Sequence, residues 1–221
     1  MKYATRGGKA FSYVEVLLSP GESVITESGA MASMDQGIDL RSSFNGGFLK
    51  ALVLRFLGKE SLFINRFQNK LQTPGRIYLT KNTPGEIVCK HLENEDIYIQ
   101  PGAFIASSSG IKFGVRWAGI SSFLGGEGLF RLRISGSGLV WYGAFGGVVE
   151  KEVNGEYVVD SGHLLSYPTD MKLKIKLAGG IFSSFFGGEG LVLKLEGQGK
   201  IQLQTRSLEG LASWLNQRFW G

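Results

Sequence analysis

The chain has 221 residues, which is enough for one large all-β domain or two small ones. Hydrophobic residues make up 43% and charged residues 19%, a globular composition that excludes an intrinsically disordered chain. Glycine contributes 33 residues, about twice its usual share, and this favours the tight turns and bends of all-β architectures. The net charge of +5 at pH 7 permits an anionic partner, but no run of lysine or arginine requires one.

Cys89 is the only cysteine, so no intrachain disulfide can form and a reducing compartment is expected. Residues 1–13 contain no apolar signal core. The uncharged stretch Ile134–Val149 has 16 residues, whereas a membrane span needs about 20 apolar residues. We therefore expect a cytoplasmic protein, and peripheral contact with a membrane stays open as an alternative.

An internal repeat is the main feature of the sequence. A block of the form Ser-Ser-Phe-x-Gly-Gly occurs at 42–47, 121–126 and 183–188. Each block precedes an apolar strand with one basic residue and a closing glycine, at 54–58, 132–136 and 193–197. Each unit opens with a turn glycine before an apolar strand, at 20–25, 101–106 and 161–166. Because the blocks recur in the same order, we expect three copies of one small β-unit.

The three units occupy residues of about 1–99, 100–159 and 160–206, and a tail of residues 207–221 follows them. Each unit is too small to bury a core alone, so we expect the units to pack side by side in one compact body. The predicted fold class is therefore all-β, built from repeated units.

Strand patterns recur along the chain. Residues 51–54 are apolar on both sides, as in a strand that is covered on both faces or lies at a subunit interface. Residues 130–134 and 172–177 alternate polar and apolar side chains, which predicts strands with one buried and one solvated face. On this pattern Arg131 and Arg133 lie on a solvated face.

Two signals stand out nearer the carboxyl end. Asn154-Gly155 separates apolar residues 148–153 from 157–159, and this dipeptide predicts a β-hairpin. In residues 208–219, apolar side chains recur at helical spacing, with Trp214 at the edge of the stripe. We therefore predict a short C-terminal helix as the single helical element.

The glycine-rich blocks resemble those of a known protein family. They are the three Ser-Ser-Phe-x-Gly-Gly strings, the Gly-Gly-Glu-Gly strings at 125–128 and 187–190, the opening Pro101–Ser107 and the tryptophan-rich end. Nearly the whole chain is similar to uncharacterised bacterial and archaeal proteins related to the mitochondrial "altered inheritance of mitochondria" biogenesis protein. The mitochondrial relative is linked to inner-membrane organisation. The resemblance implies no enzymatic activity, so it carries over no functional residues.

The resemblance also implies a fold like that of the trp RNA-binding attenuation protein, a short double-stranded β-helix, and assembly into a homotrimer. The residues agree with this, because the glycine-rich loops 119–128 and 179–190 would leave large apolar side chains bare on a monomer. A closed trimer covers such side chains. The candidate oligomer-interface residues are Phe44, Phe123, Leu124, Phe182, Phe185 and Phe186.

Catalytic and metal-binding chemistry is poorly represented. His91 and His163 are the two histidines, and they fall at different points of the repeat, so they predict no metal site. Cys89 lies in an apparent strand, which favours a buried structural thiol over a nucleophile. No phosphate-binding loop or dinucleotide fingerprint is present. We therefore expect no catalytic residue, no metal and no cofactor.

Two sets of charged residues recur with the repeat. Arg55, Arg133 and Lys194 are candidate anion-binding residues, because one cation per unit would form a basic ring in a trimer. The favoured interpretation is a solvent-facing charge that prevents edge pairing, so nucleic acid is not expected as the partner. Glu127 and Glu189 are candidate caps of loop backbone N–H groups, and the alternative places them on a ring axis as a cation or partner site.

The C-terminal helix offers an interaction surface. Its apolar face can dock on its own or a neighbouring subunit, which is the favoured interpretation, or lie on a membrane interface. The sequence therefore predicts a non-enzymatic structural or interaction protein that forms a homotrimer. The alternative is a ring-like protein that binds RNA or a small ligand at the boundaries between units. A third hypothesis, an enzyme whose site is shared between subunits, stays open.

Overall fold

The computed structural model describes residues 1–42, 64–117, 130–177 and 191–219. Within these ranges sixteen strands and one helix are present. The strands of the first half are β1 (Lys2–Arg6), β2 (Tyr13–Leu18), β3 (Ser23–Glu27), β4 (Met31–Met34), β5 (Ile38–Ser42), β6 (Ile64–Asn69), β7 (Gly75–Leu79) and β8 (Ile87–Glu93). The later elements are β9 (Ile97–Ile99), β10 (Phe104–Ser107), β11 (Ile111–Trp117), β12 (Phe130–Gly143), β13 (Val148–Asp160), β14 (Leu164–Pro168), β15 (Lys172–Leu177), β16 (Leu191–Gln204) and α3 (Leu208–Phe219).

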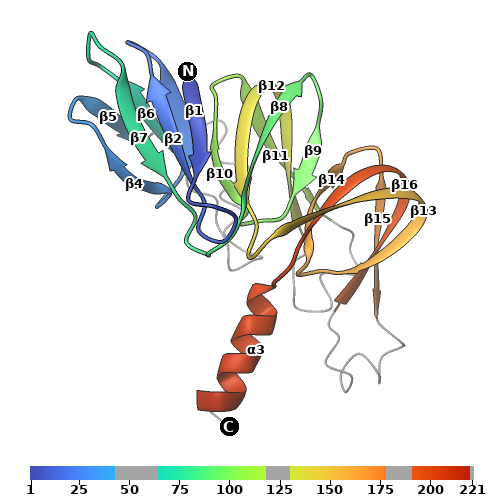
Figure 1. Ribbon diagram of the computed structural model, residues 1–221. Helices are drawn as coiled ribbons and strands as arrows, with labels where there is room; N and C mark the ends of the chain where they lie inside the picture. The colour runs from blue at the N-terminus through green and yellow to red at the C-terminus, as the bar shows by residue number, and fades with distance from the viewer. Residues whose placement is uncertain (43–63, 118–129, 178–190, 220–221) are drawn as a thin grey trace.

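The strands form two sheets, which confirms the prediction of a mostly β protein with a short C-terminal helix. A four-stranded sheet has the order β1-β2-β7-β4. A larger sheet follows the path β13-β16-β14-β9-β12-β10-β3-β6-β5, with β8 and β11 also paired to β12, and β15 to β16. Figure 1 shows strands β8 to β12 lying between the N-terminal strands and the layer formed by β13 to β16.

The two longest strands, β12 and β16, connect different parts of the larger sheet. The first half of β12 pairs with β11 and its second half pairs with β8 and β10. In the same way, the first half of β16 pairs with β15 and its second half with β14. Gly136 and Gly197 have φ of 102° and 136°, which favours glycine, so they allow the strands to bend at the change of partner.

The predicted hairpin at Asn154-Gly155 is wrong. β13 continues without interruption through this dipeptide and pairs with β16 along its whole length, with Asn154 opposite Gln198 and Gly155 opposite Gly197. Gly155 has a φ of 104°, so it does adopt the conformation that favours glycine. Here the two facing glycines allow both paired strands to bend, and the chain does not reverse direction.

Alternation of side chains builds the core. In β2 the side chains of Val14, Val16 and Leu18 are completely buried, whereas the residues between them are not. They pack with Phe67 of β6 and Trp141 of β12, so this cluster joins the four-stranded sheet to the larger one. Two further clusters lie within the larger sheet, one around β9 to β12 and one around β13 to β16.

A similar pair of hydrogen-bonded turns flanks a short strand at three places. The strands are β3, β10 and β14. The preceding turns join the N–H of Glu22, Ala103 and His163 to the carbonyls of Ser19, Gln100 and Asp160, at 3.0, 3.1 and 3.0 Å. The following turns join the N–H of Ala30, Ile111 and Met171 to the carbonyls of Glu27, Ser108 and Pro168, at 3.2, 3.3 and 3.3 Å.

The C-terminal helix α3 leaves the end of β16 and projects away from the sheets (Figure 1). Ser207 precedes it as an N-cap, because its Oγ accepts a hydrogen bond of 3.0 Å from the N–H of Gly210. Glu209 in the first turn and Arg218 in the last turn both complement the helix dipole. No helix in the described ranges combines the length and the apolar character needed to cross a membrane.

Candidate functional site

Most of the predicted site residues lie outside the described part of the chain. They are Arg55, Glu127, Glu189, Phe44, Phe123, Leu124, Phe182, Phe185 and Phe186. Arg133 in β12 and Lys194 in β16 are described, and both lie in the first half of a long strand.

Both described cations are paired with carboxylates. Arg133 donates to Asp96 through Nε at 3.0 Å, and this hydrogen bond raises the pKa of its guanidinium. Lys194 pairs with Glu156 and, at 3.3 Å, with Glu196, and the hydrogen bond to Glu156 raises its pKa. An anion that approached either cation would therefore compete with a carboxylate of the same chain.

The expectation that Arg131 lies on a solvated face is wrong. Leu132 and Ile134 are buried as predicted, but Arg131 is only 2% exposed although it points to the other side of the strand. Its Nε and Nη2 atoms have no hydrogen-bond partner among the described residues. Burial lowers the pKa of its guanidinium, and Tyr167 and Glu209 lie within electrostatic range. The alternating pattern hid this residue, because periodicity reports which residues share a face and not what covers that face.

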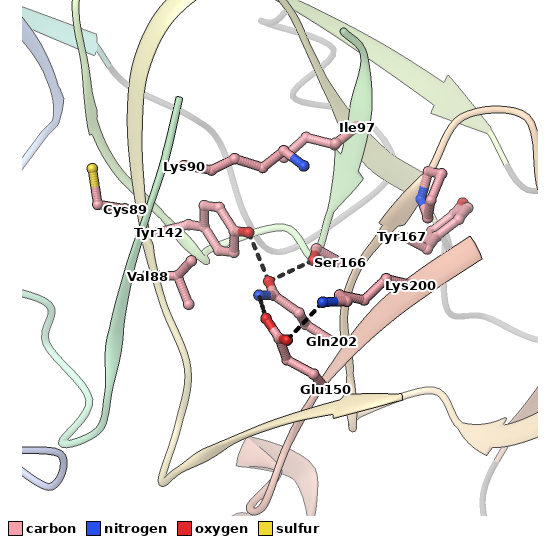
Figure 2. Close-up of a pocket in the computed structure, with 11 residues that line it drawn as sticks. Val88, Cys89, Lys90, Ile97, Tyr142, Glu150, Ser166, Tyr167, Lys200 and Gln202 are labelled. Carbon is pink, nitrogen blue, oxygen red and sulfur yellow. Dashed lines mark hydrogen bonds and ion pairs between the residues drawn. The ribbon is translucent and has the colours of Figure 1, made fainter. Parts of the chain in front are cut away.

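A cleft of about 320 Å³ lies where β8, β9 and β12 meet β13, β14 and β16. Figure 2 shows its lining side chains, which come from segments far apart in the sequence. Its lining residues are Val88, Cys89, Lys90, Ile97, Tyr142, Glu150, Ser166, Tyr167, Pro168, Lys200 and Gln202. The sequence did not predict this cleft, because its lining residues are brought together only by strands that pair at long range.

A chain of hydrogen bonds crosses the cleft (Figure 2). The hydroxyl groups of Tyr142 and Ser166 both donate to Oε1 of Gln202, at 2.7 and 2.8 Å. Nε2 of Gln202 donates to Oε1 of Glu150 at 3.2 Å, and Nζ of Lys200 lies 3.2 Å from the other oxygen of Glu150. The hydrogen bonds to Gln202 and Lys200 lower the pKa of Glu150, which stays ionised.

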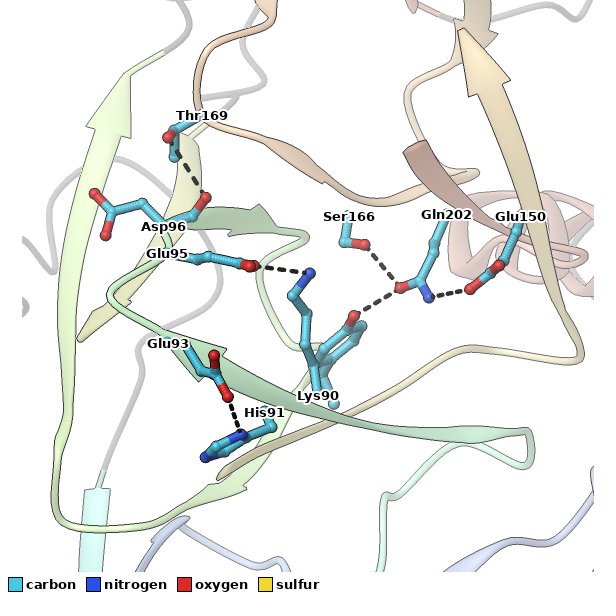
Figure 3. A network of polar contacts seen from close by, with 10 residues as sticks. Lys90, His91, Glu93, Glu95, Asp96, Glu150, Ser166, Thr169 and Gln202 are labelled. Carbon is cyan, nitrogen blue, oxygen red and sulfur yellow. Dashed lines mark hydrogen bonds and ion pairs between the residues drawn. The ribbon is translucent and has the colours of Figure 1, made fainter. Parts of the chain in front are cut away.

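The cleft has two buried phenols and a charged rim. Burial raises the pKa of both Tyr142 and Tyr167 to about 12, so both phenols stay neutral. Nζ of Lys90 lies 3.3 Å from Oε2 of Glu95. Figure 3 shows this ion pair beside the Gln202 network, and shows the side chain of His91 turned to Glu93, at 3.4 Å.

The single thiol and the second histidine have structural surroundings. The Sγ of Cys89 points away from the other cleft residues (Figure 2), and burial raises the pKa of this half-buried thiol. A thiol with a raised pKa is a poor nucleophile. Nδ1 of His163 lies 2.7 Å from the carbonyl oxygen of Gln204, which ties the Asp160–His163 turn to the end of β16. Over the described ranges, no group of three or more His, Cys, Asp and Glu residues is placed to hold a metal ion.

Helix α3 presents a second candidate surface. None of its residues is buried, although large apolar side chains recur on one face at helical spacing. The exposed apolar residues are Leu208, Leu211, Trp214, Leu215 and Phe219, and Phe219 is 72% exposed. The guanidinium of Arg218 lies 4.4 Å from the ring centroid of Trp214 and covers part of that ring.

Two sheets of antiparallel strands, a polar cleft and an exposed C-terminal helix define a mostly β protein without a recognisable catalytic constellation in the described residues. The family profile described as mitochondrial biogenesis AIM24 matches residues 3–206, so the chain belongs to this family. The resemblance noted from the glycine-rich blocks is thereby confirmed.

Two bacterial proteins are similar over nearly their whole length. An uncharacterized protein of Streptococcus pyogenes serotype M6 is 27% identical over 226 residues, which cover 98% of this chain and 90% of that protein. The crystal structure of a Streptococcus pyogenes protein superimposes with a TM-score of 0.81 at 27% identity, covering 99% of both chains. The fold described above is therefore shared with an experimentally determined structure.

Proposed function

We propose that this protein is a non-enzymatic interaction scaffold that self-associates as a homotrimer, with α3 docked on a neighbouring copy. The body is built from three repeated β-units of the short double-stranded β-helix type. The single observation that carries the interaction role is the unpartnered apolar face of α3. The trimer is the assembly that the family resemblance implies.

The repeat is supported by strand register. Two ladders of paired residues correspond in length. The β12–β8 ladder runs from the pair Ser137–Glu93 to the pair Gly143–Ile87. A stretch of the β16–β13 ladder has the same length. In that second ladder, Gln198 pairs with Asn154 and Gln204 with Val148. The three pairs of turns around β3, β10 and β14 add a third occurrence of the same local path. These recurrences favour units that were copied within one chain.

The interaction role is supported by the energetics of α3. A helix of 12 residues is marginal in water on its own, and Gly210 costs it about 1 kcal/mol relative to alanine. Most helical stability in proteins comes from packing an apolar face. Because α3 buries none of its residues on its own chain, another surface has to supply that packing.

A second copy fits this helix better than an anionic membrane does. Helices that bind anionic lipid carry lysine and arginine along the polar face, whereas α3 has only Arg218 balanced by Glu209. The body exposes apolar side chains that a second copy can cover, among them Leu40 and Val158 on strands and Phe11 between β1 and β2. We therefore take the neighbouring copy as the occupant.

The test changes the apolar face of α3 and leaves the helix intact. Leu211→Gln with Leu215→Gln removes two exposed leucines, each worth about 1.5–3 kcal/mol when buried. Ser213→Gln with Gln217→Asn, on the opposite face, is the matched control. Light scattering during gel filtration should give three times the chain mass of 24.1 kDa for the wild type and the control, and a smaller particle for the leucine variant.

Three results would contradict the proposal. A wild-type monomer at micromolar concentration rejects self-association. A leucine variant that stays trimeric shows that α3 does not hold the assembly. If that variant also loses binding to vesicles of anionic and zwitterionic lipid that the control retains, the helix is a membrane anchor instead.

A further inference from the structure

We propose that the cleft between β8, β12, β14 and β16 binds a small polyhydroxylated anion, the class that includes sugar acids and sugar phosphates. Lys90 and Lys200 both line the cleft. Figure 2 shows the ammonium group of Lys90 above the hydroxyl and amide groups of the floor, and that of Lys200 beside them, directed to Glu150. This cleft lies within a single chain and shares no residue with the apolar face of α3. The proposal therefore stands whether or not the chains associate.

The dimensions and walls of the cleft suit one small molecule. Its volume of about 320 Å³ is at the lower end of the range of about 300–1,000 Å³ that is usual for ligand pockets. Val88, Ile97 and Pro168 supply apolar wall, and the ring of Tyr167 supplies an aromatic surface beside them. Apolar walls with a few convergent polar groups are typical of ligand sites.

The cleft lining carries two ammonium groups and one carboxylate, that of Glu150, so its net charge favours an anion. Each lysine ammonium has three donors, and among the described residues Lys90 is paired with one carboxylate, that of Glu95, at 3.3 Å. This pair is exposed, and exposed ion pairs are worth about 0–1 kcal/mol, so a ligand can share or replace it at little cost. Lys200 is 54% exposed and pairs with Glu150 and Glu152 at the rim.

Positive charge also lies behind the cleft wall. Arg131 is buried, its Nε and Nη2 find no hydrogen-bond partner within the described part of the chain, and it is within electrostatic range of Tyr167. Arg116 also acts on Tyr167 electrostatically, and its own guanidinium donates to the hydroxyl of Tyr98 at 3.1 Å. Because Arg131 has little solvent to screen it, its charge adds to the attraction that an anion in the cleft would feel.

The polar floor favours hydroxyl groups in the ligand. Tyr142 and Ser166 use their protons on Gln202, so their oxygens keep lone pairs that can accept. Nε2 of Gln202 donates to Glu150 and has a second hydrogen to give. A floor that offers both donors and acceptors at hydrogen-bond distance from one another matches hydroxyl groups, which both donate and accept. A ligand with an anionic end and hydroxyl groups uses both parts of the cleft.

Calorimetric titration of the full chain tests the ligand class. Gluconate and glycerol phosphate carry both features, glucose has the hydroxyls without the charge, and acetate has the charge without the hydroxyls. We expect gluconate or glycerol phosphate to bind one per chain with Kd below about 1 mM, and glucose and acetate to bind at least about tenfold more weakly. The tighter of the two anions identifies carboxylate or phosphate as the preferred charged group.

Substitution of the lysines tests the location. Lys90→Met with Lys200→Met removes both ammonium groups and should weaken binding at least about tenfold. Lys112→Met on β11, an exposed position outside the cleft, is the matched control and should bind as the wild type does. Circular dichroism verifies that both variants fold. The proposal is overturned if both anions bind no more tightly than acetate, or if the double variant retains wild-type affinity.

Discussion

Arg131 shows how much a single side chain can cost when its partners are missing. A buried guanidinium loses its hydration, and burial is tolerated when hydrogen bonds or an opposite charge replace the water. Arg131 is 2% exposed, and two of its three guanidinium nitrogens have no hydrogen-bond partner in the ranges that the structure describes. Tyr167 and Glu209 act on it only through their electrostatic fields. This position therefore destabilises the isolated chain.

Replacing this arginine should stabilise the protein. We expect Arg131→Met, which keeps a long apolar stem, to raise the free energy of unfolding in denaturant by at least about 1 kcal/mol. Arg131→Lys keeps the charge and should bring no such gain. A fall in the free energy of unfolding for Arg131→Met would contradict this prediction.

At the scale of elements, facing glycines keep β13 and β16 paired through a bend. Gly155 and Gly197 lie opposite each other, both with positive φ. A Cβ at Gly155 would meet no atom within 4 Å, so the cost of adding one is backbone strain alone. The glycine is therefore needed for its conformation and not for space.

Alanine substitution separates conformation from packing. Gly155→Ala should lower the free energy of unfolding by about 1–3 kcal/mol, because alanine rarely adopts this φ. Gly114→Ala in β11, where φ is not positive and the nearest atom is 3.7 Å away, should change it by no more than about 0.5 kcal/mol. Equal effects in chemical denaturation would contradict a special role for Gly155.

Periodic elements were predictable from the sequence and the cleft was not. Lys172–Leu177 alternates strictly and forms β15 with the expected bounds, and the helical stripe of the tail forms α3. The Asn154-Gly155 signal failed because a long partner strand, β16, offered pairing on both sides of it. The cleft depends on which strands pair at long range, and no local pattern around Gln202 or Tyr142 records that.

At the scale of the whole molecule, several of the basic side chains are paired with carboxylates of the same chain. Arg133 faces Asp96, Lys194 faces Glu156 and Glu196, and Lys174 also binds Glu196, at 2.7 Å. A surface of paired charges attracts a polyanion weakly, because each contact with phosphate has to displace a carboxylate. The net charge alone is therefore a poor guide to the partner.

The two described basic positions should contribute little to nucleic-acid binding. We expect Arg133→Ala with Lys194→Ala to leave retention of the protein on immobilised RNA unchanged at low salt, because both cations are already neutralised. Lys70→Ala, at an exposed cation directly after β6, serves as the reference. A marked loss of retention in the double variant alone would revive a basic ring as the binding surface.

Strand β16 links the two surfaces described above. Lys200 and Gln202 line the cleft near its end, and only residues 205–207 separate the strand from α3. A displacement of the helix is therefore transmitted through this short connection to the strand that forms part of the cleft floor. If a partner bound to α3 changes the affinity of the cleft for a small molecule, then that molecule must change the affinity of α3 for the partner by the same factor.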